Sequence, residues 1–272
     1  MAIFVKAKNL SPWRRLSLAC WGSPNDPTVY GGFEFDATFV LNLLDKLNET
    51  STVKITLTHL FAKILGLLIA SHPQVNGVIK WGTIYYRQSV DLFVQVAIPQ
   101  NRFSGDQLSG VKICQINHKS LADIATELSG RAQAVRSDKD PQFQKHFNMT
   151  RYVPQFALKT LLWLNSFLVH NLGLNLPALG LNADPFGSAM FTSVGSLDVP
   201  PGFAPLVPPS YCPIIFCLGR IEKKPWVVGD HIEARPVAGF TITFDHRFMD
   251  GLTGAKMFNT LMEYLYHPEK AL

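Results

Sequence analysis

Residues 240–251 read Phe240-Thr241-Ile242-Thr243-Phe244-Asp245-His246-Arg247-Phe248-Met249-Asp250-Gly251. Aromatic and β-branched residues alternate as far as Phe244, which predicts a strand, and the residues after Gly251 have the periodicity of a helix. The strand therefore ends in a turn that carries His246, a side chain that titrates near neutrality and suits proton transfer. Gly251 allows the tight backbone of such a junction. The spacing by itself fits an ordinary turn as well as a catalytic one.

The rest of the chain predicts an α/β fold. Apolar residues recur with helical spacing over residues 37–47, 56–71, 119–136 and 252–266. Strand composition follows a turn at Gly31-Gly32 and is found again over residues 78–86, 91–99, 111–116, 190–194, 211–220, 226–232 and 237–244. Strands and helices alternate first and strands then cluster, so we expect one mixed β-sheet with helices packed on it.

Composition adds an expectation about assembly. The 272 residues are 47% hydrophobic and only 17% charged, whereas soluble domains usually contain roughly 25% charged residues. That is little charge for the surface of a monomer, so we expect an oligomer, with a thick-cored monomer as the alternative. The length suits a single domain over residues 1–272.

Charge and cysteine patterns narrow the partners and the compartment. The net charge is +5, but Lys and Arg are scattered, so no nucleic-acid-binding arm is predicted. A weak positive field of this kind suits a phosphate-bearing small molecule or an acidic protein partner. The cysteines at positions 20, 114, 212 and 217 form no C-x-x-C pair and read as free buried thiols. With no signal peptide at the N-terminus, we expect a cytoplasmic protein.

One segment departs from the alternating pattern. Between residues 160 and 183 no residue carries a formal charge, and many are leucine or aromatic. Polar residues and Pro177 interrupt the run well before the ~18 apolar residues that a membrane-spanning helix needs. We expect a helical insertion at about 150–183, with a helix that ends near Leu172 and is capped by Gly173. Subunit contact, a lid over a channel and docking to a membrane surface are three alternatives for its role.

Several stretches together resemble one protein family. Residues 243–251 closely resemble the active-site motif of the dihydrolipoyl acyltransferase components of 2-oxoacid dehydrogenase complexes, and chloramphenicol acetyltransferase has a related motif of His, three residues, Asp and Gly. Residues 218–232 resemble the hairpin that leads into this motif, and residues 90–99 and 119–124 resemble a central strand and the helix after it. The resemblance implies the two-layer α/β fold of chloramphenicol acetyltransferase, a mixed sheet with helices packed on it.

The resemblance also implies which residues form the site. Residues 187–196 align with the family's strand that carries a catalytic serine, which places Thr192 at that position and Ser193 one residue away. Threonine keeps the hydroxyl but adds a methyl group beside the reacting centre. Trp13-Arg14-Arg15 is similar to a segment of the antibiotic acetyltransferase in which one arginine binds the motif aspartate. Arg14 or Arg15 is thereby expected to pair with Asp250, and two solvated arginines are the alternative.

Acyl transfer from a thioester needs a base for the incoming nucleophile and hydrogen-bond donors for the tetrahedral oxyanion. The resemblance assigns these roles to His246 and Thr192, and it makes Asp250 and Gly251 part of the scaffold of the loop. It implies coenzyme A, as acyl-CoA, for the substrate and a homotrimer with each active site at a subunit interface. No lipoyl attachment site or peripheral-subunit-binding domain is found before Phe33, so we expect a lipoyl-carrier protein or other 2-oxoacid dehydrogenase components as partners in trans.

Three functions are compatible with these residues: acyl transfer from acyl-CoA to a dihydrolipoyl thiol, acyl transfer to a small hydroxyl or amine metabolite, and a catalytically silent oligomeric core or assembly protein. No metal site and no transmembrane segment are expected. The remaining histidines have no mutual spacing of metal ligands and are interpreted as structural or surface residues: His59, His72, His118, His146, His170, His231 and His267.

Overall fold

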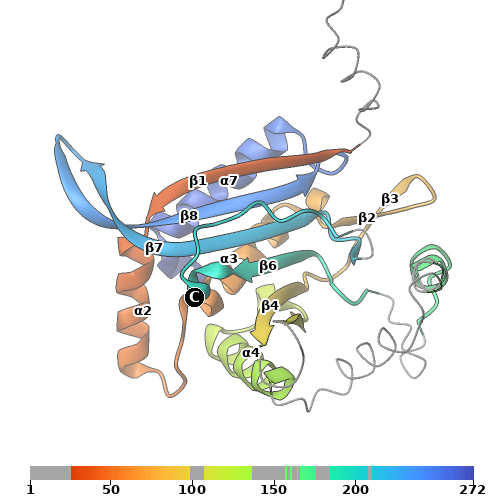
Figure 1. Ribbon diagram of the computed structural model, residues 1–272, viewed down its shortest axis with the longest axis horizontal. Helices are drawn as coiled ribbons and strands as arrows, with labels where there is room; N and C mark the ends of the chain where they lie inside the picture. The colour runs from red at the N-terminus through yellow and green to blue at the C-terminus, as the bar shows by residue number, and fades with distance from the viewer. Residues whose placement is uncertain are drawn as a thin grey trace, which may run out of the picture.

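The structure, a computed structural model, describes residues 26–98, 107–136, 157, 160, 164, 166–175, 184–207 and 210–272. Its main feature is a six-stranded sheet in the order β1-β8-β7-β6-β4-β5 (Figure 1). The pairs β4–β6 and β6–β7 are parallel and the others are antiparallel, so the sheet is mixed, as predicted. The strands are β1 (Thr28–Asp36), β4 (Leu92–Ile98), β5 (Gln107–Ile113), β6 (Ala189–Ser193), β7 (Ile214–Val228) and β8 (His231–Asp245).

Helices form the second layer. The long helix α3 (Leu57–Ser71) contacts α2 (Thr38–Thr50), α4 (Leu121–Arg136) and α7 (Gly251–Tyr266). In the view of Figure 1, α3 and α7 lie behind the sheet. Each of the four helices lies where apolar periodicity predicted one, with ends that differ by at most three residues.

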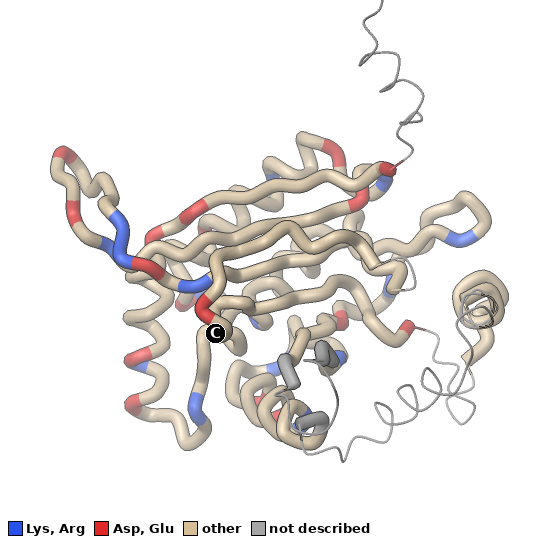
Figure 2. Tube along the Cα trace, in the orientation of Figure 1, with Lys and Arg blue, Asp and Glu red and all other residues tan. Residues whose placement is uncertain are grey.

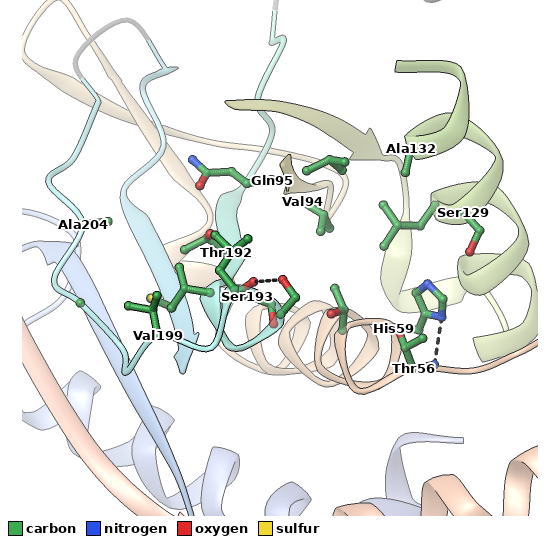
Figure 3. A pocket seen from close by; sticks show the side chains of 18 of the residues that line it. Thr56, His59, Val94, Gln95, Ser129, Ala132, Thr192, Ser193, Val199 and Ala204 are labelled. Carbon is green, nitrogen blue, oxygen red and sulfur yellow. Dashed lines mark hydrogen bonds between the residues drawn. The ribbon is translucent and has the colours of Figure 1, made fainter. Parts of the chain in front are cut away.

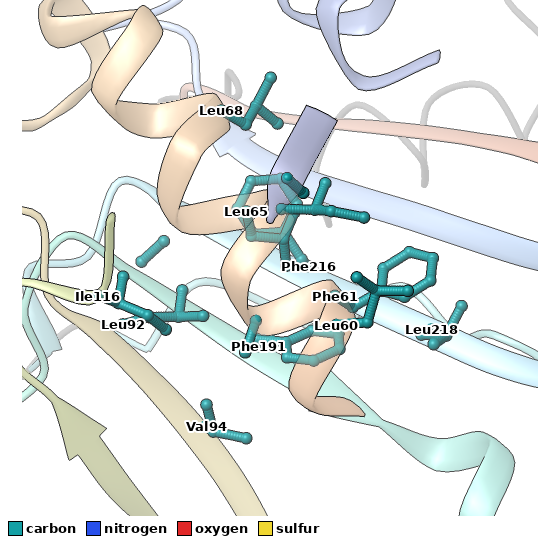
Figure 4. Packing of buried hydrophobic residues seen from close by; sticks show 14 of the residues in the cluster. Leu60, Phe61, Leu65, Leu68, Leu92, Val94, Ile116, Phe191, Phe216 and Leu218 are labelled. Carbon is teal, nitrogen blue, oxygen red and sulfur yellow. The ribbon is translucent and has the colours of Figure 1, made fainter. Parts of the chain in front are cut away.

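The core lies between α3 and the central strands, and aromatic rings fill much of it (Figure 4). Phe61 of α3 stacks on Phe191 of β6 with ring centroids 6.3 Å apart and an interplanar angle of 19°. Phe216 of β7 and Phe240 of β8 are also fully buried. Burying side chains of this size is the main driving force for closing the helix layer onto the sheet.

Because Phe191, Phe216 and Phe240 point toward the helices, the residues that follow them in the strands point toward the opposite face of the sheet. Successive side chains of a strand point to opposite faces, so the residue after each phenylalanine points away from the helices. These residues are Thr192, Cys217 and Thr241, which are paired in register across β6, β7 and β8. The alternation therefore carries the hydroxyl of Thr192 to the face without helices.

That face is crossed by residues 198–207, which we call the crossover segment (Figure 1). Pro201 packs against Gly219 of β7 and Gly239 of β8, where a Cβ atom at Gly219 would lie 2.2 Å from the proline Cδ. The Thr241 hydroxyl donates a hydrogen bond of 2.7 Å to the carbonyl of Gly202. The two glycines that leave room for Pro201 are distant from it in the chain, so local sequence does not reveal this crossing.

Three predictions about strands were wrong in detail. Residues 211–220 and 226–232 are not two strands: β7 runs from Ile214 to Val228 and turns into β8 at Gly229, whose φ is +58°. Gly31-Gly32 is no turn but lies within β1, opposite Ile242 and Thr241. Residues 78–86 form a separate hairpin of β2 (Gly77–Lys80) and β3 (Thr83–Tyr86). In the second case long-range pairing overrides the local turn signal of glycine.

Charge is unevenly placed over the fold (Figure 2). The part of the β7–β8 hairpin that extends beyond the sheet carries several ion pairs, among them Arg235 with Glu233 at 2.7 Å. The ends of the hairpin also expose Val227 and Ile232, which face each other in register and are 70% and 75% accessible. Exposed apolar side chains of this kind agree with the expectation of an oligomer without identifying its interface.

The insertion and the cysteines are only partly covered by the described residues. Phe167–Asn171 form one turn of π-helix, and Gly173 has a φ of +69°, the conformation expected of a C-cap. No helix within the described part of the chain is long and apolar enough to cross a membrane. Cys212 and Cys217 are free and buried, as predicted, whereas Cys114 is exposed, and Cys20 lies outside the described residues.

Candidate active site

His246 is the first residue after β8, at the predicted junction of strand and helix. Its side chain is exposed, and its backbone N–H donates to the carbonyl of Pro27 at 2.8 Å. The residues beside it hold the turn: the buried Asp245 carboxylate accepts bonds from the backbone N–H of Arg247 at 2.9 Å and from its Nη2 at 2.6 Å. The Asp245–Arg247 ion pair therefore joins the two residues on either side of His246.

Two further contacts anchor the turn after His246. Met249 is 3% exposed and belongs to the core. Phe248 lies against Gly77, where a Cβ atom would be 2.5 Å from the phenylalanine ring, so only glycine admits this approach. Because both side chains are held by the fold, the position of the His246 backbone is fixed before any substrate binds.

Asp250 begins α7. Its Oδ1 accepts the backbone N–H of Thr253 at 2.8 Å, the geometry of an N-cap, and Gly251 is the first residue of the helix. This bond from the Thr253 N–H holds the pKa of Asp250 below its ordinary value. Both Asp250 and His246 are exposed in the single chain. Arg14 and Arg15, the expected partners of Asp250, lie outside the described residues.

Sequence reasoning missed the roles of Asp245 and Arg247, although both lie inside the motif. The available signal was the spacing of a carboxylate two residues before a backbone N–H, the arrangement of an Asx turn. The structure adds a bidentate arginine contact to that turn. These two residues hold the backbone on either side of His246.

Replacing Asp245 with asparagine is expected to loosen this turn. The neutral amide keeps one acceptor but loses the charge-assisted bonds to Arg247, so the free energy of unfolding should fall by about 1–3 kcal/mol. Turnover should fall by up to about 10²-fold through misplacement of His246, with KM unchanged. Denaturant unfolding and steady-state kinetics measure the two effects. Asp198→Asn, at an aspartate whose side chain is 90% exposed, is the matched control, and equal behaviour of the two variants would contradict the positioning role.

Thr192 lines a cavity of about 780 Å³ beside β6 (Figure 3). The walls come from β4, β6, the first turn of α3, α4 and the crossover segment. Ser193 lines it too, and its carbonyl accepts the Ser196 hydroxyl at 3.0 Å. No hydrogen bond to the Thr192 hydroxyl is found among the described residues, so this hydroxyl is available to a ligand. None of the described residues that line the cavity is Asp, Glu, Lys or Arg.

Cys217, next to Thr192 in the sheet, also reaches this cavity. Burial raises the pKa of its thiol above the ordinary value, so the group is protonated at neutral pH and is a poor nucleophile. His59, interpreted from the sequence as structural, lines the cavity at its α3 end. In the described part of the chain, no group of three or more His, Cys, Asp and Glu side chains could hold a metal ion.

Thr192 and His246 do not meet within one chain. Thr192 is level with Thr241 of β8, two strands away, and His246 lies five residues further along that strand. With about 3.4 Å per residue along a strand and about 4.8 Å between strands, the two residues are roughly 20 Å apart. This separation is too large for both to contact one thioester carbonyl.

Comparisons with known proteins agree with this architecture. A chain from the cubic core of the pyruvate dehydrogenase multienzyme complex superimposes with a TM-score of 0.66 at 19% identity, over 91% of this chain and 84% of that one. Chloramphenicol acetyltransferase superimposes with a TM-score of 0.50 at 11% identity, over 88% and 89% of the two chains. The fold is therefore the predicted chloramphenicol acetyltransferase-like one.

A sequence relative is the dihydrolipoyllysine-residue acetyltransferase component of the pyruvate dehydrogenase complex of Staphylococcus aureus. It is 41% identical over 58 residues, which are 21% of this chain and 14% of the length of that relative. The profile of the family described as 2-oxoacid dehydrogenases acyltransferase (catalytic domain) matches residues 22–143 and 186–272, most of the chain. The matched ranges contain the sheet, the four helices, Thr192 and the whole His246 turn. The chain thus belongs to the 2-oxoacid dehydrogenase acyltransferase family, as a catalytic domain of it.

Proposed function

We propose that this acyltransferase moves an acyl group from acyl-CoA to a dihydrolipoyl thiol by direct attack, with His246 as the general base. The observation that carries the proposal is the His246 turn, which presents an accessible imidazole on a backbone fixed by the Asp245–Arg247 ion pair, Phe248 and Met249. A base that waits for a substrate must be both accessible and preorganised. Membership of the family supports the reaction type.

The chemistry needs no enzyme-bound acyl group. His246 removes the proton from the acceptor thiol as its sulfur attacks the thioester carbonyl, which forms a tetrahedral oxyanion. The Thr192 hydroxyl donates a hydrogen bond to that oxyanion. Collapse of the intermediate breaks the bond to the coenzyme A sulfur, and the leaving thiolate takes the proton back from the imidazolium. Asp250 acts as the cap that starts α7 behind the loop and takes no part in proton transfer.

The distance of roughly 20 Å between Thr192 and His246 supports assembly of the site from two chains. In a homotrimer, the His246 turn of one subunit would face the Thr192 cavity of its neighbour. The exposed His246 and Asp250 would then be covered. The low charge content of the chain supports the same arrangement. A dihydrolipoyl group on a carrier protein, or the free cofactor, would then be the acceptor.

Complementation between inactive variants tests the shared site. His246→Ala and Thr192→Val chains with different tags are coexpressed, and mixed oligomers are isolated by two affinity steps. Each chain lacks a different half of the site, and every mixed cyclic trimer contains one complete site out of three, so the isolated oligomers should have about a third of the wild-type activity. His246→Ala chains carrying both tags serve as the control and should stay inactive. Mixed oligomers as inactive as this control would exclude a site shared between chains.

An acceptor panel separates this function from its alternatives. Release of the coenzyme A thiol from acetyl-CoA is followed with dihydrolipoamide and then with small hydroxyl and amine acceptors. Dihydrolipoamide is expected to be the best acceptor. Faster thiol release with a hydroxyl or amine compound would show that the acceptor is such a metabolite, with the same mechanism. No thiol release with any acceptor would support an assembly role.

A further inference from the structure

His59 occupies an unusual position at the start of α3. The backbone N–H of Thr56 donates to His59 Nδ1 at 3.2 Å, so the ring completes a capping box at the N-terminus of the helix. A backbone N–H is always a donor, so Nδ1 accepts and the proton of the neutral ring resides on Nε2. Burial lowers the pKa of His59 below its ordinary value, which keeps the ring neutral at physiological pH.

The other nitrogen of this ring faces the cavity. Figure 3 shows the ring above Thr56, with its second nitrogen directed away from Thr56 on the side of α4. Among the described residues no acceptor for this Nε2–H is found. A donor that is fixed by its own cap and left without a partner is ready to bind an acceptor on a ligand.

The described walls of the cavity mix polar and apolar side chains. At the α3 and α4 end they include the polar side chains of Thr58, Ser129 and Gln133 beside the apolar Leu128 and Ala132. On the side of the crossover segment they include Val199 and Ala204 (Figure 3). Since no charged side chain is found at either end among the described residues, a neutral polar group such as an amide suits the α3 end better than a phosphate or carboxylate does.

We propose that His59 donates its Nε2–H to an amide carbonyl in the arm of the acyl-thioester substrate, and thereby selects amide-bearing donors. This inference rests on the proposed function, since coenzyme A carries two secondary amides between its thiol and its phosphates. The Thr192 hydroxyl and the His59 donor line one continuous cavity. Binding the arm at His59 aligns the thioester carbonyl with Thr192 at the same time.

The test compares two donors in His59 variants. His59→Leu removes the donor, so KM for acetyl-CoA should rise roughly 3- to 10-fold, the effect of one neutral hydrogen bond, with kcat unchanged. KM for S-acetyl-2-mercaptoethanol, which lacks amides, should not change. His59→Gln retains an acceptor for Thr56 and an N–H donor and should keep most of the affinity for acetyl-CoA. Equal changes of KM for both donors would overturn the role of His59 and leave the proposed function intact.

Two further variants separate binding from helix stability. His59→Glu keeps the capping-box acceptor but has no donor, so it should bind acetyl-CoA as weakly as His59→Leu while α3 stays capped. Ser120→Ala removes the cap of α4, where Ser120 Oγ accepts from the Asp123 backbone at 3.2 Å. Ser120→Ala should lower the free energy of unfolding about as much as the loss of the α3 cap in His59→Leu does. It should leave KM for acetyl-CoA unchanged.

Calorimetric binding of coenzyme A to each variant repeats the comparison without turnover. Wild-type protein that neither binds coenzyme A nor releases thiol would exclude the proposed function itself, and the role of His59 with it. Wild-type binding that His59→Leu and His59→Glu leave unchanged would overturn only the inference about His59.

Discussion

Replacing His246 with alanine is expected to lower kcat by about 10²- to 10⁴-fold, the range contributed by a general base. The reason is chemical: without the imidazole the acceptor thiol keeps its proton when it meets the thioester. The fold should persist, because the side chain is exposed and the turn is anchored through Asp245, Phe248 and Met249. Release of the coenzyme A thiol with acetyl-CoA and dihydrolipoamide measures turnover, and circular dichroism with thermal unfolding measures the fold.

His267→Ala is the control for this substitution. His267 is also an exposed histidine near the C-terminus, with a side-chain accessibility of 59%, and it lies at the far end of α7 from the motif. Its replacement should leave turnover within the error of the assay. Activity of His246→Ala close to that of the wild type would remove His246 from the mechanism, whatever the fold resembles.

Replacing Thr192 with valine is expected to lower kcat by about 10²- to 10³-fold, corresponding to about 2.7–4 kcal/mol for one oxyanion donor. Valine has nearly the shape of threonine, so the strand and the cavity wall should be retained while the hydroxyl is lost. Thr192→Ser keeps the hydroxyl and removes the methyl group, and it should retain most of the activity. Single-turnover measurements with saturating acetyl-CoA isolate the chemical step.

Ser193→Ala distinguishes the two adjacent hydroxyls. Phe191 is fully buried in the core, so alternation along β6 directs Thr192 to the opposite face and predicts a smaller effect for Ser193. A large loss in Ser193→Ala, together with near-normal activity of Thr192→Val, would transfer the oxyanion role to Ser193.

Much of the fold could be predicted from local patterns, because helix and strand periods are local properties. The junction at His246 was predicted from local sequence, and α7 begins at Gly251, one residue before the predicted start of the helix at residue 252. Errors arose where a distant partner overrides a local preference. Gly31 and Gly32 lie within β1 because β8 pairs with them, and Pro201 crosses the sheet because Gly219 and Gly239 leave room for it.

The sequence by itself determined the kind of chemistry at the candidate site: a histidine after a strand, a hydroxyl on another strand, and a family motif around the first. Only the tertiary structure decided how far apart these groups lie, which face of the sheet Thr192 occupies and that His59 shares its cavity. The physical reason is that strand order and register arise from contacts between residues far apart in the chain. Side-chain identity specifies what a residue can do, and the packing of Phe191, Phe216 and Phe240 fixes where it does so.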